Sequence, residues 1–369
     1  MARITAGIIG IGYIGTSQIE AINRLGYARV GAIMMRDAGR ARAICEKTGI
    51  PKFYTDYREL LNDPEIQVIH NCTPNHLHYP INLETIAAGK HILSEKPLTL
   101  FSKESAELTR LAAERQVANG VNFINRHFPI IQHIKGMIDA GELGTIYAIH
   151  GAYLQDWLLY DTDYDWRVDP EMSGPSRAVG DIGSHWFDMA QYLLGSKISE
   201  VNADLATVIP IRKKTDAAGA VEEVAVHTED FGTMMLHFEN GVRGCVTVSQ
   251  VSAGRKSEFS LEINGSKASV YWNQETPHSL WIGHRNQPNQ TMTSRPNLLN
   301  ERGKTVSILG SGYERWPEAQ KNLIHSFYST ILEGAPPQYA TFADAHQTMR
   351  VIDAVLASHQ SRAWRKVGE

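Results

Sequence analysis

The amino-acid sequence predicts an α/β protein with two domains. The first is a doubly wound parallel sheet, and the second is an α+β domain with a large, mainly antiparallel open sheet. Apolar strand-like runs alternate with helical patterns over residues 1–125, which is typical of a parallel sheet. Asn-Gly turns between alternating runs mark hairpins further along the chain. The chain of 369 residues is also longer than a domain built around a single small hydrophobic core usually is.

The first strand is the continuous apolar run 4–9, and a G-x-G-x-x-G turn follows it. In the strand–turn–helix–strand context, Gly10 makes a tight turn, Gly12 admits a pyrophosphate and Gly15 lets the helix pack closely. The following helix would offer its N–H groups and positive dipole to phosphates. The alternative is a glycine-rich turn without a ligand, but the flanking pattern favours a dinucleotide site of the Rossmann type.

Two polar motifs follow later strands of this domain. Thr73-Pro74-Asn75 and Glu95-Lys96-Pro97 each come where an apolar run ends. Ligands of doubly wound sheets bind beyond the carboxyl ends of the strands. We therefore expect Lys96 to point at the cofactor crevice.

The end of the second strand bears on the choice between NAD and NADP. An NAD site usually has Asp or Glu there, bonded to the ribose hydroxyls. Here Met35 takes that place, and Arg36 and Arg40 could bind a 2′-phosphate. Alternatively, Asp37 could turn in and hold the ribose. The pattern slightly favours NADP.

Composition excludes several classes of partner. The net charge is -4, and Lys and Arg are scattered, which argues against nucleic acid and anionic membranes. No apolar run is long enough to span a bilayer. The three cysteines have neither metal-ligand spacing nor an even number for pairing, so we expect no metal and a cytoplasmic location.

Residues 126–340 are predicted to form the second domain, which binds substrate and self-associates. A helix leads into a series of strands, and the segments FENGVRG and EINGSKAS read as hairpins. The spare face of such a sheet predicts a homodimer or homotetramer. Residues 341–369 are predicted to add a C-terminal helix.

Asp181 and His185 are spaced i, i+4 on a predicted helix and would share one face. A carboxylate beside an imidazole raises its basicity and fixes its orientation. Proton transfer near neutral pH needs such a group. The alternative is a capping aspartate and a packed histidine.

Taken together, these motifs resemble the Gfo/Idh/MocA family of NAD(P)-dependent sugar and polyol oxidoreductases, over nearly the whole length. One departure is the segment GPSRAVGD, where many relatives have three glycines before the aspartate. The motifs are Gly10-x-Gly12-x-x-Gly15, Thr73-Pro74-Asn75, Glu95-Lys96-Pro97, Asn125-Arg126, Trp166-Arg167 and Asp181-x-x-x-His185.

The resemblance implies roles for several of these residues. Lys96 would contact both substrate and nicotinamide, often before a cis proline, and His185 would exchange the proton with Asp181 as its partner. Trp166 and Arg167 would lie near the nicotinamide. The residues expected to bind the cofactor are Gly10, Gly12, Tyr13, Ile14, Gly15, Met35, Arg36, Arg40, Thr73, Asn75, His78, Glu95, Lys96, Asn125, Trp166 and Arg167.

The segment 153–171 alternates aromatic and acidic residues. Aromatic faces pack on sugar C–H surfaces and carboxylates accept hydrogen bonds from hydroxyls, so the segment suggests a neutral sugar; a solvated acidic loop is the alternative. Trp316 and His325 are further pocket candidates, although packing roles are favoured for both. The residues expected to bind substrate are Lys96, Tyr153, Gln155, Trp157, Asp181 and His185.

We therefore expect an enzyme that moves hydride between NAD(P) and a secondary hydroxyl or ketone of a neutral sugar, sugar derivative or inositol-like polyol. Lys96, Asp181 and His185 would be the catalytic residues. Two alternatives stay open: a redox-neutral NAD-dependent enzyme that cleaves glycosides, and a non-catalytic NAD(P)-binding regulator. The intact catalytic residues argue against the regulator.

Overall fold

A computed structural model describes residues 4–216, 218–307 and 315–369. The chain divides into two compact units: Met1–His127 with Trp316–His346, and Phe128–Arg315 with Gln347–Glu369. The chain therefore returns to the first unit near its end. This differs from the predicted boundaries, which kept residues 126–340 together and treated 341–369 as a separate helix.

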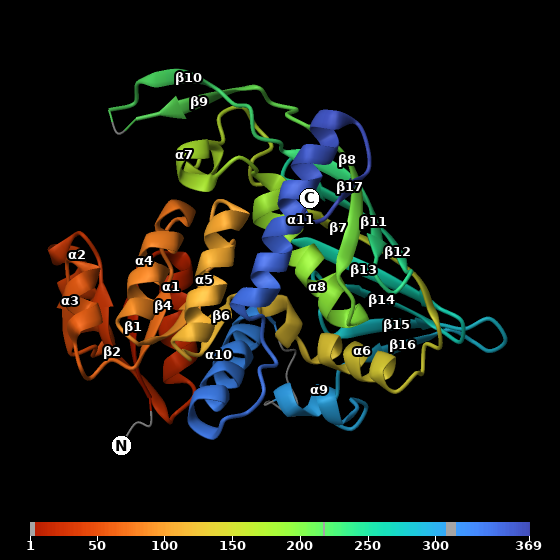
Figure 1. Ribbon diagram of the computed structural model, residues 1–369, viewed down its shortest axis with the longest axis horizontal. Helices are drawn as coiled ribbons and strands as arrows, with labels where there is room; N and C mark the ends of the chain where they lie inside the picture. Colours follow the sequence, from red (N-terminus) through yellow and green to blue (C-terminus); the bar gives the residue numbers. More distant parts are fainter. Residues whose placement is uncertain (1–3, 217, 308–314) are drawn as a thin grey trace. The chain divides into compact units, whose positions relative to one another are not determined.

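The first unit contains a six-stranded sheet in the order β3-β2-β1-β4-β5-β6, and all its neighbouring strands are parallel (Figure 1). This confirms the predicted doubly wound sheet. The order reverses between β1 and β4, and in such sheets ligands bind at this switch point. The strands are β1 (Ile4–Ile9), β2 (Ala28–Met34), β3 (Lys52–Tyr54), β4 (Val68–Asn71), β5 (His91–Ser94) and β6 (Asn119–Val121).

The helices of the first unit include one from near the end of the chain. Leu323 and Phe327 of this helix, α10, are fully buried in the same core as Ile8 and Ile22. That packing explains why the returning segment belongs to the first unit. The helices are α1 (Tyr13–Asn23), α2 (Ala38–Thr48), α3 (Tyr57–Asn62), α4 (His78–Ala87), α5 (Ser102–Glu114) and α10 (Trp316–Glu333).

The second unit contains a nine-stranded sheet in the order β16-β15-β14-β13-β7-β12-β11-β8-β17. Among the described strands of this sheet, only β7 and β12 pair in parallel, and all other neighbours are antiparallel. The predicted mainly antiparallel sheet is confirmed. The strands are β7 (Ile146–Leu154), β8 (Ile198–Ala206), β11 (Phe231–Phe238), β12 (Arg243–Ser249), β13 (Glu258–Gly265), β14 (Ser269–Asn273), β15 (Ser279–Gly283), β16 (Gln290–Thr293) and β17 (Arg365–Lys366).

A separate two-stranded hairpin, β9 (Ile211–Thr215) and β10 (Val221–Ala225), interrupts the chain between β8 and β11 (Figure 1). Sequence analysis did not predict it. Residues 223–240 read as a single strand in the sequence, whereas the structure has β10, then a break, and then β11.

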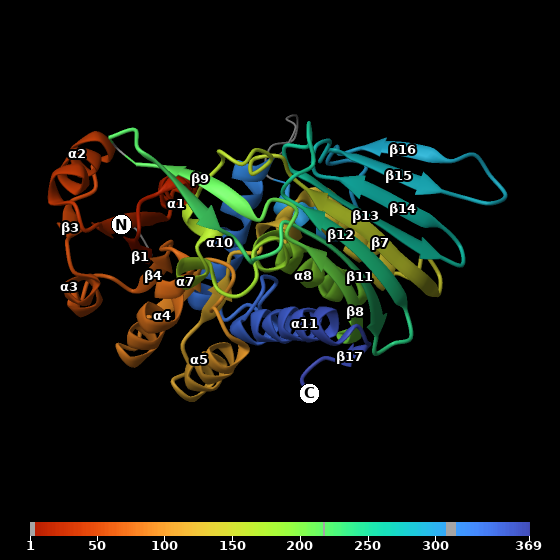
Figure 2. The same cartoon turned by 90° about the horizontal axis from the view of Figure 1, so that it is seen from above.

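Helices cover one face of the large sheet, where α8 and part of α11 lie (Figure 2). Strand residues facing them, such as Met234, Leu236 and Val246, are buried, whereas Met235 between them is exposed. α11 begins in the first unit and continues into the second. The helices that lie wholly or partly in the second unit are α6 (Pro129–Asp139), α7 (Pro170–Ser173), α8 (Ser184–Leu194), α9 (Glu301–Val306) and α11 (Phe342–Ser361).

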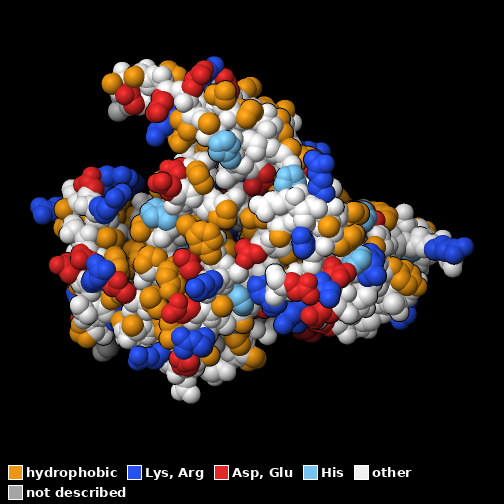
Figure 3. Space-filling view, turned by 45° about the horizontal axis from the view of Figure 1, so that its top comes forward, with side chains coloured by type: hydrophobic (Ala, Val, Ile, Leu, Met, Phe, Trp, Pro, Cys, Tyr) orange, Lys and Arg blue, Asp and Glu red, His pale blue; other side chains and the backbone are white. Residues whose placement is uncertain are grey.

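Charged side chains of both signs are interspersed on the face seen in Figure 3. Among the residues described, no helix is long and apolar enough to cross a membrane. The same residues include no group of three or more His, Cys, Asp or Glu side chains arranged to hold a metal ion.

Candidate active site

The glycine-rich turn after β1 has the geometry of a phosphate-binding turn. Gly10 has φ +88°, and a Cβ there would lie 2.7 Å from the carbonyl oxygen of Cys72. A Cβ on Gly15 would lie 2.3 Å from the carbonyl oxygen of Gly10, whereas one on Gly12 would meet nothing within 4 Å. Only glycine fits at positions 10 and 15, whereas the backbone at Gly12 is open to a ligand.

Tyr13 and Ile14 begin α1 directly after this turn. No side chain caps the N-terminus of α1, and its first turn has no acidic residue. Its N–H groups and positive dipole are therefore suited to phosphate oxygens. The ring of Tyr13 is 81% exposed and lies 6.0 Å from the ring of Trp316 in the same unit.

Just after β2, the carboxylate of Asp37 caps the N-terminus of helix α2. Its carboxylate accepts a hydrogen bond from the backbone N–H of Arg40 over 3.0 Å, which makes Asp37 the N-cap of α2. Met35 is half-buried, and the side chains of Arg36 and Arg40 are exposed. The aspartate is thus a helix cap, and the other polar side chains at this end of β2, those of Arg36 and Arg40, are exposed.

His78 joins the two loops that follow β4 and β5. Its Nδ1 lies 2.7 Å from the carbonyl oxygen of Pro97, and its Nε2 lies 2.8 Å from that of Thr73. The ring is wholly buried, and burial lowers its pKa to about 4. A neutral ring can donate to only one of these carbonyls. His78, predicted to touch cofactor, therefore fixes the loops that carry Thr73, Asn75 and Lys96.

Lys96 follows β5 and is half-buried, and its peptide bond to Pro97 is cis. The preceding carboxylate, Glu95, points into the unit: it is 7% exposed and accepts hydrogen bonds from Gln18 over 3.0 Å and Asn122 over 2.5 Å. Burial raises the pKa of Glu95 to about 7, although the Lys96 ammonium opposes the shift. Glu95 was predicted to contact the cofactor, and its internal hydrogen bonds point to support of Lys96 instead.

Gln18 extends this network to His70 and Tyr328. Gln18 Oε1 lies 2.5 Å from His70 Nδ1, and His70 Nε2 lies 2.8 Å from the Tyr328 hydroxyl. The network ties α1, β4 and α10 together beneath the loop of Lys96. Sequence analysis missed Gln18, His70 and Asn122, since none of them belongs to a motif and their partners lie far away in the sequence. Asn125, the remaining predicted cofactor contact in this unit, lies on the buried turn Ile124–His127.

In the second unit, Asp181 lies in the π-helical turn Val179–Gly183 and His185 lies in the first turn of α8. π-helical turns inside helices often mark functional sites. This wider winding replaces the single α-helix that the i, i+4 spacing predicts. His185 is 9% exposed, and its ring centroid lies 6.0 Å from that of Tyr153.

Two side chains hold the Asp181 carboxylate. Gln250 donates from Nε2 to Asp181 Oδ2 over 3.0 Å, and Arg167 Nε lies 3.7 Å from Asp181 Oδ1. Both favour the charged carboxylate. Gln250 is wholly buried and was not among the predicted residues; the only signal is its position just after the apolar strand β12.

The aromatic side chains of the segment after β7 gather around Arg167. Its guanidinium carbon lies 4.4 Å from the ring centroid of Trp166 and 5.7 Å from that of Trp157. Trp157 Nε1 donates to Gln155 Oε1 over 2.8 Å. Tyr153 stacks on Phe259, with ring centroids 5.2 Å apart. These contacts link Asp181, Arg167 and Trp157, and a separate ring contact places Tyr153 beside His185.

Four of the five aspartates of this segment, Asp156, Asp161, Asp163 and Asp165, contact groups within the unit. Asp156 pairs with Lys256 and Asp161 with Lys213, each over 2.6 Å, and Asp165 pairs with Arg167 over 3.1 Å. The Asp163 carboxylate accepts the backbone N–H of Tyr160 over 2.8 Å. Three of the four charges are balanced, so the acidity of the segment is a weaker argument for a neutral substrate than sequence analysis supposed.

The two residues for which packing roles were favoured lie in the first unit. His325 Nδ1 is 2.7 Å from the hydroxyl of Tyr27, and Trp316 lies against Tyr13. These contacts support packing for His325 and leave Trp316 beside the glycine-rich turn.

Comparison with known proteins assigns both parts of the chain. Residues 4–123 match the family model described as "Oxidoreductase family, NAD-binding Rossmann fold", and residues 131–271 match the "GFO/IDH/MocA C-terminal domain". Levoglucosan dehydrogenase of Pseudarthrobacter phenanthrenivorans is 30% identical over 99% of this chain and 98% of its own. Myo-inositol 2-dehydrogenase of Thermotoga maritima is 29% identical over 72% of this chain and 74% of its own.

Solved structures agree in fold. Levoglucosan dehydrogenase in complex with NADH and L-sorbose has a TM-score of 0.92 at 28% identity, covering 100% of both chains. Its complex with NADH and levoglucosan has a TM-score of 0.91 at 28% identity, covering 99% of this chain and 100% of that one. The chain therefore belongs to the Gfo/Idh/MocA family and is an NAD(P)-dependent oxidoreductase of the sugar and polyol dehydrogenase type.

Proposed function

We propose that the protein oxidises a secondary hydroxyl of a neutral cyclic sugar or inositol-like polyol, or reduces the corresponding ketone. The observation that carries the proposal is the held carboxylate of Asp181, four residues before a nearly buried histidine. Gln250 and Arg167 fix that carboxylate, and Tyr153 packs beside the His185 ring. This is the environment that a proton-transfer group needs.

In the oxidation direction, His185 accepts the hydroxyl proton and the C–H bond of the same carbon is lost as hydride. The Lys96 ammonium donates a hydrogen bond to the oxygen and stabilises the negative charge that develops on it. The nicotinamide, when bound, supplies the hydride acceptor. Reduction reverses each step: hydride arrives at the carbonyl carbon and His185 returns the proton.

The substrate class rests on two kinds of support. Two relatives that cover more than two thirds of the chain are named for levoglucosan and myo-inositol, both neutral cyclic polyols, and a third, 26% identical, is named for glucose 6-phosphate. In this chain the indole rings of Trp157 and Trp166 lie by Arg167 and near Asp181, and aromatic faces of this kind suit the C–H surfaces of a sugar ring. We therefore infer an anhydro-sugar or a cyclitol ahead of a sugar phosphate.

We infer a preference for NADP over NAD from the end of β2. Asp37 is used as the helix cap, Met35 cannot accept a hydrogen bond from a ribose hydroxyl, and Arg36 and Arg40 are exposed. The 2′-phosphate would give the two arginines a partner.

Two further parts of the proposal concern the whole molecule. The face of the large sheet away from the helices exposes Met235 (48%) and Tyr271 (36%), which supports a homodimer or homotetramer formed through it. Cys45, Cys72 and Cys245 are all free thiols, which supports a cytoplasmic location.

A cofactor and substrate screen tests the proposal. NAD and NADP would each be mixed with the protein and levoglucosan, myo-inositol or a neutral aldose, and the absorbance of the reduced nicotinamide would be followed. Turnover with one cofactor and a set of related polyols is the expected result. Release of free sugar from a glycoside without net change in the nicotinamide would identify the glycoside-cleaving alternative. Dinucleotide binding without turnover, in both directions of the assay, would identify the regulator.

A further inference from the structure

The base of the β9–β10 hairpin contains a completely buried arginine. Arg212 lies on β9 with 0% of its surface exposed, although its neighbour Ile211 is 52% exposed. A fully buried arginine is rare unless its charge and its donors are matched. The contacts of Arg212 therefore show what the hairpin is attached to.

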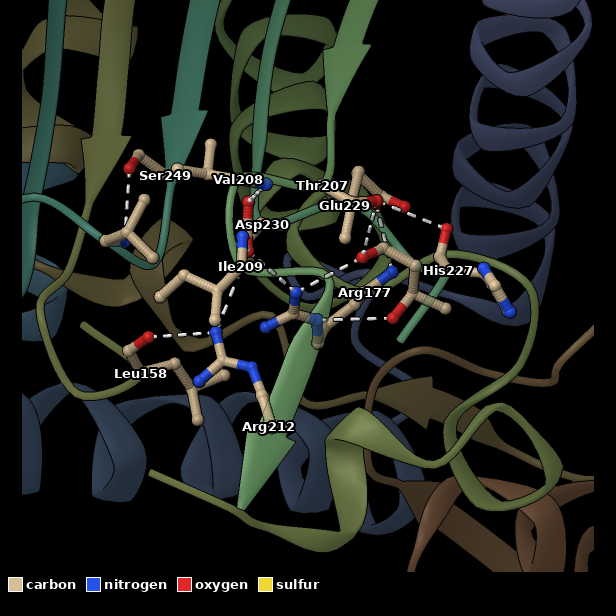
Figure 4. Close-up of polar contacts among 12 residues, drawn as sticks. Leu158, Arg177, Thr207, Val208, Ile209, Arg212, His227, Glu229, Asp230 and Ser249 are labelled. Carbon is tan, nitrogen blue, oxygen red and sulfur yellow. Dashed lines mark hydrogen bonds and ion pairs between the residues drawn. The ribbon is translucent and has the colours of Figure 1, made fainter. Parts of the chain in front are cut away.

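Arg212 binds three backbone carbonyls of one segment. Its Nη1 donates to the carbonyl oxygens of Tyr160, over 3.0 Å, and Asp163, over 2.9 Å. Its Nη2 donates to that of Leu158 over 2.9 Å (Figure 4). A planar guanidinium can serve several acceptors at fixed angles, which an ammonium cannot do. The segment thus folds around the arginine directly after Trp157.

The charge of Arg212 is balanced by an equally buried aspartate. Asp230 Oδ2 lies 3.7 Å from Nη2 of Arg212 and 3.3 Å from Nη2 of Arg177. The same carboxylate accepts the backbone N–H groups of Val208, over 2.6 Å, and Ile209, over 3.1 Å, at the root of the hairpin. Figure 4 shows the two arginines on either side of Asp230.

The neighbouring carboxylate, Glu229, holds the segment that leads to Asp181. Its Oε1 accepts the backbone N–H groups of Arg177 and Val179, each over 2.9 Å, and the hydroxyl of Ser176 over 2.7 Å. The backbone N–H of Asp181 in turn donates to the carbonyl oxygen of Arg177 over 2.7 Å. Glu229 and Asp230 therefore connect the catalytic turn to the base of the hairpin.

The other side of the cluster reaches the aromatic segment. Leu158 is packed with Val168 and Val226, and Trp157 lies against this small core. Trp157 is also the ring under Arg167, which lies beside Asp181. A shift of the segment around Arg212 would move Trp157 and Arg167 relative to Asp181.

We propose that Arg212 is a specificity-determining positioning residue: from the hairpin it fixes the backbone of 158–163, and so sets where Trp157 and Arg167 lie relative to Asp181. The hairpin is then part of the substrate-binding apparatus, although Arg212 itself touches neither substrate nor cofactor. This inference rests on the proposed function, because it assigns the binding of the polyol ring to that segment.

The test compares three variants. Arg212→Lys keeps a positive charge near Asp230 but cannot reach three carbonyls. Asp163→Ala removes the acceptor of the Tyr160 N–H from the same segment and leaves the buried charges intact. Arg243→Lys is the matched control, because Arg243 also donates to backbone carbonyls, those of Gly241 and Val242, but at an exposed turn.

The readouts are KM and kcat for levoglucosan and myo-inositol, the dinucleotide Kd from nicotinamide fluorescence, and Tm. Arg212→Lys is expected to raise the KM for the polyol about tenfold or more and to change the ratio of the two polyols. Its dinucleotide Kd should change by a smaller factor than the KM for the polyol, since the glycine-rich turn expected to bind the pyrophosphate belongs to the first unit. Asp163→Ala should also raise the KM for the polyol, but by a smaller factor. Arg243→Lys should have the KM and kcat of wild type.

Each outcome decides between the roles. If Arg212→Lys folds and keeps the wild-type KM and polyol ratio, Arg212 only stabilises the fold and the inference is wrong. If Arg212→Lys does not fold, Asp163→Ala decides, and an unchanged KM in that variant overturns the inference. A wild-type protein inactive on both polyols with both cofactors, in both directions, overturns the proposed function and the inference with it.

Discussion

Gln250 donates a hydrogen bond from Nε2 to Oδ2 of Asp181 over 3.0 Å, and the glutamine is wholly buried. Arg167 Nε lies 3.7 Å from the other oxygen of the same carboxylate. The glutamine therefore fixes the rotation of Asp181 while the arginine favours its charge. Orientation and charge are what the proposed partnership of Asp181 with His185 would require.

Gln250→Leu should lower kcat more than it changes the dinucleotide Kd. Loss of a hydrogen bond to a charged group costs about 1.5–3 kcal/mol, so we expect kcat to fall about 10- to 100-fold. Steady-state kinetics measure the fall. Gln191→Leu is the control, because Gln191 accepts a single backbone hydrogen bond from Ile198, over 3.0 Å, in a different part of the second unit. Equal kcat values for the two variants would show that Gln250 does not orient Asp181 for catalysis.

Glu95→Gln tests the buried carboxylate that precedes Lys96. The pKa of Glu95 is raised from 4.5 to about 7 by burial, so the folded protein keeps this proton in a pH range where the unfolded chain releases it. The free energy of unfolding of wild type should therefore fall as pH rises from about 4.5 to about 7. The Lys96 ammonium and the hydrogen bonds from Asn122 and Gln18 lower the pKa of Glu95 and so oppose the effect of burial.

The variant cannot titrate at this position, so its stability relative to wild type should rise by at most about 3 kcal/mol from about pH 4 to about pH 8. Urea unfolding across this range measures the difference. In activity, wild type should show an ionisation near neutral pH that the variant lacks. A stability difference that is independent of pH would mean that Glu95 ionises normally in the folded protein.

Met35→Asp should move cofactor preference toward NAD. The new carboxylate would accept hydrogen bonds from ribose hydroxyls and repel a 2′-phosphate, so the ratio of kcat/KM for NAD to that for NADP should rise about 10- to 100-fold. Arg36→Ala should weaken NADP alone, and Arg42→Ala on the exposed face of α2 serves as control. An unchanged ratio in Met35→Asp would show that the end of β2 does not contact the ribose.

The first sheet could be predicted almost completely because its signals are local. A continuous apolar run, three glycines at fixed spacing and a helical pattern are all found within residues 4–25, and the structure confirms them. The hairpin at 211–225 could not be predicted, because most of the described residues in it are exposed and the one buried among them, Arg212, is charged. Asp230, which pairs with Arg212, and the backbone carbonyls that Arg212 binds lie outside the hairpin.

The residues of the candidate site were likewise predictable only where the signal is local in the sequence. Asp181 and His185 stand out because carboxylate and imidazole lie four residues apart. Nothing near Glu95 in the sequence shows that its carboxylate is bonded to Gln18 and Asn122, whereas the position of Asp37 before a helical pattern does fit the N-cap that the structure shows. The roles of such groups depend on partners that only the folded chain brings near.

We propose that Lys96 acts on the reacting oxygen and is not needed to hold the dinucleotide. The most direct measurement compares wild type and Lys96→Ala for turnover of the best polyol and for dinucleotide Kd. Removal of one such donor costs about 10²–10³ in kcat. We predict a loss of at least that size with a Kd within about threefold of wild type. Turnover of Lys96→Ala at the wild-type rate would contradict the account.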